Sequence, residues 1–260
     1  MKKFTALLLT VLFLLSMTSC ALGEKLSAYD QYMKAAKALN EAGSMETDIT
    51  SVIKMTMGDE SQTMGMDGSL KLIVNSETDI DFEMTMDMDL FGQTIPVLYY
   101  YTDGFMYMDM MGIQMKLPLP MEKALEQAGG TETLDFDESA VKDVTTETVD
   151  GETIIKFKLD ASAITAVLED QIADLAGSLE DADIDYNFGD VDLKIVIGSD
   201  KNLKSHSLAY SFTMEMDGEE VACEMDMTMD IVKIGNVTID FPSFDGYMEI
   251  SEEDMESIGL

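Results

Sequence analysis

Apolar and polar residues alternate one by one over long stretches of this chain, and this period of two constrains its fold more than any other feature. In the clearest stretch, residues 79–90, isoleucine, phenylalanine, methionine and leucine fill the even positions. The odd positions carry five acidic residues and one threonine. Successive side chains of a strand point to opposite faces, so this stretch predicts a strand with one apolar and one acidic face.

The same alternation recurs along the chain and predicts an antiparallel sheet. The expected strands are 49–57, 64–74, 79–90, 94–102, 105–117, 141–149, 152–160, 191–198, 203–217, 219–235 and a short one at 237–241. Asp-Gly pairs at 103–104, 150–151 and 217–218 favour tight hairpin turns. Apolar residues at three- and four-residue spacing predict helices at 25–42 and 162–179, with a short helix at 121–128. About ten antiparallel strands with two main helices make an α+β chain, and no linker divides it.

The first twenty residues have the features of an export signal. Lys2 and Lys3 precede an apolar run at 4–15, which is too short to span a membrane. We therefore expect residues 1–19 to be a signal peptide. The segment ending at Cys20 resembles a bacterial lipoprotein signal, which implies that Cys20 is lipidated and becomes the first mature residue. An ordinary secretory signal with an incidental cysteine is the alternative.

The balance of charge excludes several partners. The chain has 51 acidic and 16 basic residues, with a formal net charge of -35. Such a negative field repels nucleic acid and gives no attraction to anionic lipid surfaces. We expect the protein to be held on the extracytoplasmic face of the cell membrane by acyl chains at Cys20, each buried methylene contributing ~0.8 kcal/mol.

Methionine is the unusual residue, with 24 copies. Residues two apart in a strand share a face, so the period-two methionines should converge on one surface. Methionine is long and flexible, and it adapts to irregular apolar contents better than a β-branched residue. We expect these side chains and nearby aromatic residues to line a cavity for a lipid or another apolar ligand. The expected lining is Met55, Met57, Met64, Met66, Phe82, Met84, Met86, Met88, Tyr99, Tyr101, Met106, Met108, Phe157, Phe212, Met214, Met216, Met225, Met227 and Met229.

Two alternatives use the same methionines differently. Alternation by itself requires only burial, so they could form a closed core in a non-enzymatic binding or sensing module. Thioethers also bind Cu(I), which would make the protein a copper binder. Only His206 and Cys223 could join them in the mature chain. We expect His206 to face solvent or to be satisfied locally on its strand, and Cys223 to be a small buried hydrophobe.

Acidic residues offer a calcium site as a further alternative. Asp181, Asp183 and Asp185 alternate like the first ligands of a calcium-binding loop. Tyr186 stands where an EF-hand needs glycine, and Asp192 stands where it has glutamate. The acidic strand face is more simply read as a solvated outer surface.

The chain carries no recognisable catalytic constellation. A zinc site needs several histidines or cysteines, and this chain has one histidine and two cysteines. No glycine-rich phosphate loop follows a strand and opens a helix. We therefore expect a protein that is not an enzyme and has no cofactor.

Four features together carry a family resemblance. They are the lipoprotein signal, a first helix with Tyr29, Ala36 and Leu39, the segment 100–107 running on to 116–118, and the closing segment 237–242. With them the chain resembles uncharacterised Gram-positive lipoproteins of the LolA/LppX-like superfamily. The resemblance implies a half-open antiparallel β-barrel with helices on its concave side, and binding or transfer of lipids or lipoproteins. We expect one such domain at 20–244 and a loose acidic tail at 245–260; no protein partner is indicated.

Overall fold

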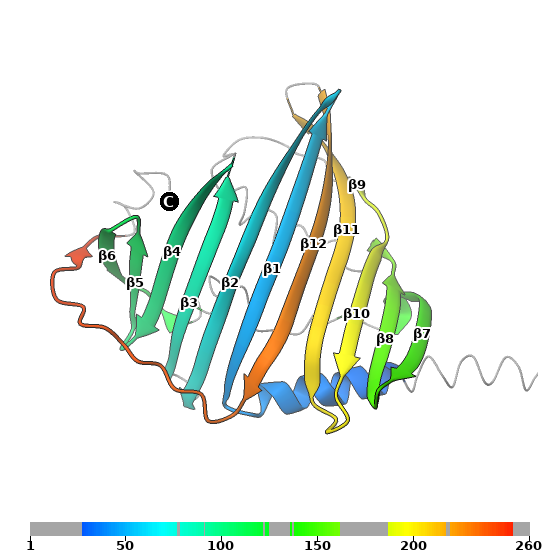
Figure 1. The fold of residues 1–260 in the computed structure, drawn as a ribbon, viewed down its shortest axis with the longest axis horizontal. Coiled ribbons are helices and arrows are strands. Elements are labelled where there is room, and N and C mark those ends of the chain that lie inside the picture. The colour runs from blue at the N-terminus through cyan, green and yellow to red at the C-terminus, as the bar shows by residue number, and fades with distance from the viewer. Residues whose placement is uncertain are drawn as a thin grey trace, which may run out of the picture.

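The computed structural model describes residues 28–76, 79–90, 92–121, 123–124, 136, 138–161, 187–216 and 219–251. In these residues the chain forms a helix at 28–40 and thirteen strands of a single sheet (Figure 1). The strands are β1 (Ser44–Met57), β2 (Glu60–Ser76), β3 (Asp79–Leu90), β4 (Gln93–Thr102), β5 (Phe105–Met110), β6 (Ile113–Pro118), β7 (Val141–Val149), β8 (Glu152–Leu159), β9 (Asn187–Phe188), β10 (Val191–Ile197), β11 (Leu203–Met216), β12 (Glu219–Ile234) and β13 (Met248–Glu249). A 3₁₀ turn, η1 (Glu138–Ala140), precedes β7. No helix of the described residues is long and apolar enough to cross a membrane.

The sheet is open and almost wholly antiparallel, as the alternation predicts. Its strands lie in the order β13-β6-β5-β4-β3-β2-β1-β12-β11-β10-β8-β7, and β9 pairs with β11. Only β13 and β6 pair in parallel within this described sheet. The long central pair of β1 and β12 joins strands from the two halves of the chain. The strand number exceeds the expected ten, and the sheet does not close on itself.

The helix at 28–40 defines the inner face of the sheet. Its buried side chains are Ala28, Tyr32, Ala35, Ala36 and Leu39, which recur every three or four residues along one stripe. The Tyr32 ring stacks on Phe136, 5.8 Å between centroids, and lies 6.1 Å from the ring of Phe157 on β8. The helix therefore closes one end of the face to which Phe157 points. The expected helix at 162–179 lies outside the described residues, as does most of that at 121–128.

Hairpin turns set the register between neighbouring strands. Asp103-Gly104 and Asp150-Gly151 all have positive φ, which confirms two of the three predicted tight turns. The third, at 217–218, lies outside the described residues. The expected strand 105–117 is wrong, because the chain turns at Met111-Gly112 and makes β5 and β6 from it. Methionine rarely takes the φ of +53° found at Met111, so the residue pair gave no turn signal.

The segment after β12 differs most from expectation. Residues 235–247, here called the strap, cross from the end of β12 to β6 (Figure 1), and 237–241 is not a strand. Gly235 N donates to the carbonyl of Ser44 at 2.8 Å, which fixes the start of the strap. At its far end, Ile250 N donates to the carbonyl of Lys116 at 2.9 Å, and Ile250 is buried. Residues 245–250 are therefore packed against the sheet instead of beginning a loose tail.

Aromatic side chains hold the strap on the outer face, opposite the helix. Phe244 stacks on Tyr107 of β5 with 3.7 Å between ring centroids. Phe241 and Phe244 also meet the ring of Tyr100 on β4 edge-on, and Tyr247 meets Tyr107. The strap thus crosses the sheet with aromatic side-chain contacts in place of ladder hydrogen bonds.

Candidate functional site

Strand register brings the expected lining residues to the inner face. Phe82 on β3 lies opposite Tyr101 and Leu72, and Met84 lies opposite Tyr99 and Leu70. Because side chains alternate, every second residue along each strand shares that face. The strand registers place all the expected lining residues with described side chains on this inner face. They are Met55, Met57, Met64, Met66, Phe82, Met84, Met86, Met88, Tyr99, Tyr101, Met106, Met108, Phe157, Phe212, Met214, Met225, Met227 and Met229.

Burial divides this face into two parts. One part is closed core: Phe82 is 0% exposed and Met106 1%, and Met84, Tyr101, Met108, Phe157 and Phe212 are also buried. These side chains pack with the helix and Phe136 in one cluster. These side chains form the tightly packed part of the inner face.

The other part is a half-buried methionine surface near the middle of the sheet and toward the tips of β1 and β2. We define the methionine surface as Met55, Met64, Met66, Met86, Met88, Met214, Met225, Met227 and Met229, all half-buried. Tyr99 is half-buried beside it, and Met57 is 44% exposed at the end of β1. Met216 lies on β11, but the structure does not describe its side chain.

Gly68 interrupts the row of inner-face side chains on β2. Gly68 of β2 lies between Ile49 of β1 and Met86 of β3, so no side chain projects from the inner face there. A Cβ atom at Gly68 would clash with the carbonyl oxygen of Thr85 and lie 3.2 Å from Cγ of Met86. The close approach of β3 therefore requires glycine at this position.

A few polar groups share the inner face. Ser51 and Thr47 of β1 are buried, and Thr47 Oγ1 has no hydrogen-bond partner among the described residues. The hydroxyl of Tyr210 donates to Sδ of Met225 at 2.9 Å. Burial, with a smaller contribution from Cys223, raises the pKa of Tyr210 to about 12. This hydroxyl therefore stays protonated and neutral at physiological pH.

The two residues expected to accompany the methionines behave differently. Cys223 of β12 is buried, as predicted, and burial raises the pKa of its thiol, so it is a poor nucleophile. His206 was expected to face solvent or be satisfied locally, and this is wrong. It pairs with Met229 on the inner face and is half-buried, and burial lowers the pKa of its imidazole. Alternation with Leu208 and Tyr210 on β11 was the available sequence signal.

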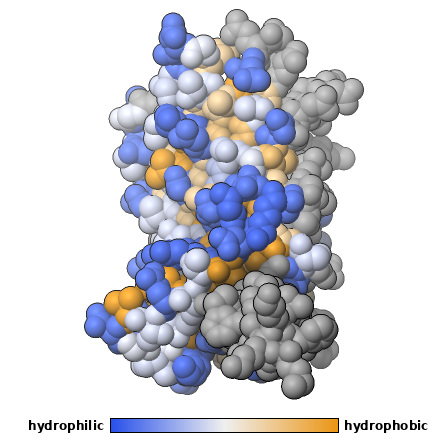
Figure 2. Space-filling model, turned by 90° about the vertical axis from the view of Figure 1, so that its right-hand side faces the viewer, coloured by the Kyte–Doolittle hydropathy of each residue, from blue (hydrophilic) through white to orange (hydrophobic). Residues whose placement is uncertain are grey.

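The acidic residues of β3 lie on the outer face, where several have an ion-pair or hydrogen-bond partner. Lys71 Nζ pairs with Glu83 at 2.7 Å, and this hydrogen bond raises the pKa of Lys71. Asn75 donates to Asp81 at 2.8 Å, and Thr94 donates to Asp89 at 3.1 Å. Seen from the β7 edge, the side of the molecule that carries the outer face is mostly hydrophilic (Figure 2).

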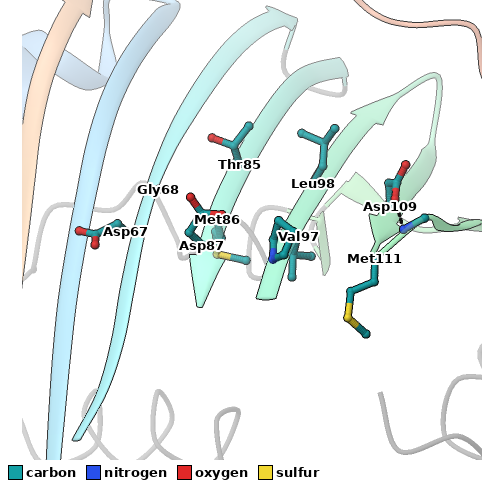
Figure 3. A pocket seen from close by; sticks show the side chains of 11 residues that line it. Asp67, Gly68, Thr85, Met86, Asp87, Val97, Leu98, Asp109 and Met111 are labelled. Atoms are coloured by element: carbon teal, nitrogen blue, oxygen red, sulfur yellow. Dashed lines mark hydrogen bonds between the residues drawn. The ribbon is translucent and has the colours of Figure 1, made fainter. Parts of the chain in front are cut away.

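An open hollow of about 660 Å³ lies on this outer face (Figure 3). Its polar lining includes Asp67, Asp87 and Asp109, with Leu98 and Met111 as apolar neighbours. Asp109 already accepts a hydrogen bond from Gly112 N at 3.0 Å. Among the described residues, no three histidine, cysteine or acidic side chains gather so as to hold a metal ion. Cys20 and the expected calcium ligands Asp181, Asp183 and Asp185 lie outside the described residues.

Comparison with known proteins gives a family and remote structural likenesses. A family of unknown function, DUF6612, matches residues 27–243. A search of curated proteins found no match. The fold is similar to LprF from Mycobacterium bovis, with 15% identity, 84% of this chain and 97% of LprF covered, and a TM-score of 0.43. It is also similar to a DUF1329 family protein from Desulfovibrio piger, with 11% identity, 85% and 96% covered, and a TM-score of 0.29.

A third similar structure is the putative outer membrane lipoprotein-sorting protein domain from Vibrio parahaemolyticus. Its identity is 9%, the coverage is 82% of this chain and 97% of that domain, and the TM-score is 0.23. At these TM-scores the likenesses do not identify a ligand.

Proposed function

We propose that this chain, which belongs to DUF6612, a family of unknown function, binds an apolar ligand on the inner face of its sheet. The ligand class is a lipid acyl chain or a molecule of similar shape, held against the methionine surface. The protein acts as a binding or carrier protein and catalyses no reaction. The contrast between sealed core and half-buried methionines on one continuous face is the observation that carries this proposal.

The chemistry of the methionine surface suits a flexible hydrocarbon. Met66 and Met88 are direct cross-strand neighbours, as are Ser51 and Met227 on the adjoining pair. The thioethers of Met66, Met88 and Met227 form a polarisable lining that can rearrange around an irregular ligand. Ser51 and Tyr210 are buried beside this lining, and the Tyr210 hydroxyl donates to Sδ of Met225.

Charge and location fit the same proposal. The outer face of the sheet carries charged acidic side chains that water solvates, whereas the inner face is apolar. We further propose that acyl chains on Cys20 hold the protein on the extracytoplasmic face of the membrane. Two acyl chains would outweigh the repulsion between a highly acidic chain and an anionic surface.

Ligand binding is tested with a fluorescent polyene fatty acid titrated into the full chain and read by fluorescence and native mass spectrometry. The variant Met66→Lys places a charge in the methionine surface, and we expect at least ~10-fold weaker binding, because a buried unpaired charge is costly. Val52→Lys is the matched control, since Val52 is 39% exposed on the outer face of the neighbouring strand. Absence of binding by the unmodified chain, or equal loss in both variants, would favour the closed-core module instead.

Anchoring is tested separately in cells that express the chain. Incorporation of an alkyne-bearing palmitate and membrane fractionation should both depend on Cys20. The Cys20→Ala variant is expected to lose the label and leave the membrane fraction, whereas Cys223→Ala keeps both. Labelling that persists in Cys20→Ala would disprove lipidation at this residue.

A further inference from the structure

His206 is the single histidine of the chain. It lies among apolar side chains, and the proposed lipid binding requires no imidazole there. It lies on β11 with its side chain on the inner face, between Ile195 of β10 and Met229 of β12. Leu208 follows it two residues later on the same face and is buried. A polar ring among aliphatic side chains costs free energy unless a partner satisfies it.

The imidazole has no such partner in the described part of the chain. Neither ring nitrogen makes a hydrogen bond or an ion pair with a described residue, and His206 is half-buried. Burial lowers its pKa, so the ring is neutral at pH 7 and one nitrogen carries a free lone pair. A neutral imidazole is the form that binds metals.

Two thioethers lie within reach of this ring. Met229 is the direct cross-strand partner of His206, and Met227 is the partner of Leu208. The two methionines are two residues apart on one strand face, about 6.7 Å along the strand. Direct cross-strand neighbours have Cβ atoms roughly 4.5–5.5 Å apart, and diagonal ones roughly 7–8 Å. Both methionines are half-buried and have three rotatable bonds with which to turn toward the imidazole.

We propose that His206, Met227 and Met229 form a binding site for a soft monovalent cation, Cu(I) or Ag(I). Thioether and imidazole ligands suit a soft metal, whereas carboxylates suit hard cations. The described inner-face neighbours of the trio are Ile49, Ser51, Leu193, Ile195, Leu208, Met225 and Ile231, and none of them is a carboxylate. Thioether ligands also favour Cu(I), the softer oxidation state of copper, over Cu(II).

This proposal does not rest on lipid binding. Its ligands are one imidazole and two thioethers. The site is therefore not a cluster of three histidine, cysteine or acidic side chains. Met227 and Met229 also belong to the methionine surface, but Met66, the residue changed in the fatty-acid test, is on β2 and does not pair with His206. Each site can therefore fail while the other survives.

The test is a titration of the full chain with Ag(I) in chloride-free buffer, followed by isothermal calorimetry. Every protein in the series carries Cys20→Ser and Cys223→Ala, so thiols cannot compete for the ion. A parallel titration uses Cu(I) with ascorbate under nitrogen, against a chromogenic Cu(I) chelator. We expect one ion per chain.

The decisive variants are His206→Phe and Met229→Leu, which keep size and apolar character. Each should weaken binding by at least ~10-fold, since loss even of an outer-shell partner typically costs ~10–100-fold. Met55→Leu is the matched control, a half-buried methionine of the same face that pairs with Cys223, and it should stay within about twofold. Circular dichroism confirms that each variant is folded.

A spectroscopic readout assigns the ligands directly. In chain labelled with ¹³C-methyl methionine, Ag(I) should shift the methyl signals of Met227 and Met229 first among the 24 methionines. Full affinity in His206→Phe or Met229→Leu would overturn the proposal. So would binding of several ions with shifts spread over many methionines, which would show unspecific thioether binding.

Discussion

His206 shows how one residue on an otherwise apolar face can govern a property of the whole fold. Its ring nitrogens have no hydrogen-bond partner among the described residues, and burial lowers its pKa below the ordinary value of about 6.5. The folded state therefore resists protonation more than the unfolded state does. Stability is unaffected above the unfolded pKa and falls as the pH drops from there toward the lowered folded pKa.

We predict that the unfolding free energy of the native chain declines more between pH 7 and pH 5 than that of His206→Phe. The difference arises because only the native chain must protonate a half-buried imidazole, and its slope can reach ~1.4 kcal/mol per pH unit. Urea unfolding at pH 7, 6 and 5 measures both chains, and the carboxylates common to both cancel in the comparison. Parallel pH profiles would contradict the prediction.

At the scale of the strand, two glycines of β2 differ in the space available for an added Cβ atom. Gly68 faces the backbone of β3 so closely that an added Cβ would clash with the carbonyl oxygen of Thr85. Gly65, three residues earlier, has 3.7 Å to Cβ of Asp89, an ordinary contact. Neither residue has a positive φ, so space alone separates them.

We predict that Gly68→Ala lowers the unfolding free energy by about 1–3 kcal/mol, because the backbone of β2 or β3 has to shift. Gly65→Ala is the control, expected to be neutral or to stabilise by about 0.4–1 kcal/mol through a less flexible unfolded chain. Urea unfolding monitored by circular dichroism gives both values. Equal effects in the two variants would show that the strand spacing is looser than the structure indicates.

The strap is the second element whose role follows from its contacts. Phe244 lies against four rings, those of Tyr100, Tyr107, Phe241 and Tyr247, and its stacking on Tyr107 is the closest. Beyond it, β13 adds two residues to the sheet edge, and Lys116 pairs with Glu249 at 3.1 Å. The strap therefore ties the β6 edge of the sheet to the end of β12.

We predict that Phe244→Ala destabilises the protein by about 1–3 kcal/mol, since aromatic pairs contribute roughly 0.5–1.5 kcal/mol each beyond the buried area. Amide hydrogen exchange should accelerate at Ile250, whose N–H is bonded to Lys116. Val232→Ala is the control, because Val232 is 55% exposed on β12. Unchanged exchange at Ile250 would show that β13 holds its place without the strap.

At the scale of the whole molecule, the charge works against the compact state. The net charge is -35, and directly paired positions such as Asp67 and Asp87 place like charges side by side on the outer face. The observed ion pairs are few and mostly exposed, so they offset little of this repulsion. Salt shortens the range of the repulsion from about 30 Å at 0.01 M to about 10 Å at 0.1 M.

We predict that added NaCl, from 10 to 300 mM, raises the unfolding free energy of the native chain. Asp87→Asn should stabilise it by about 0.2–1 kcal/mol at low salt and by less at high salt, because one opposed like-charge pair is removed. Glu60→Gln is the control, since Glu60 lies opposite Met57 and has no paired carboxylate across the strand. A benefit of Asp87→Asn that does not fall with salt would point to a cause other than charge.

Most strands, their alternation and the turns at Asp103-Gly104 and Asp150-Gly151 follow from the amino-acid sequence alone, because these depend on neighbours two to four residues apart. It also placed the methionines on one face. The tertiary structure decided which of them are sealed and which are half-buried, since that depends on where the helix and neighbouring strands lie. It alone paired His206 with Met229, split β5 from β6 at a methionine turn, and laid the strap across the outer face. Each of these joins residues far apart in the chain or held in a backbone form that their side chains do not favour, so no local pattern encodes them.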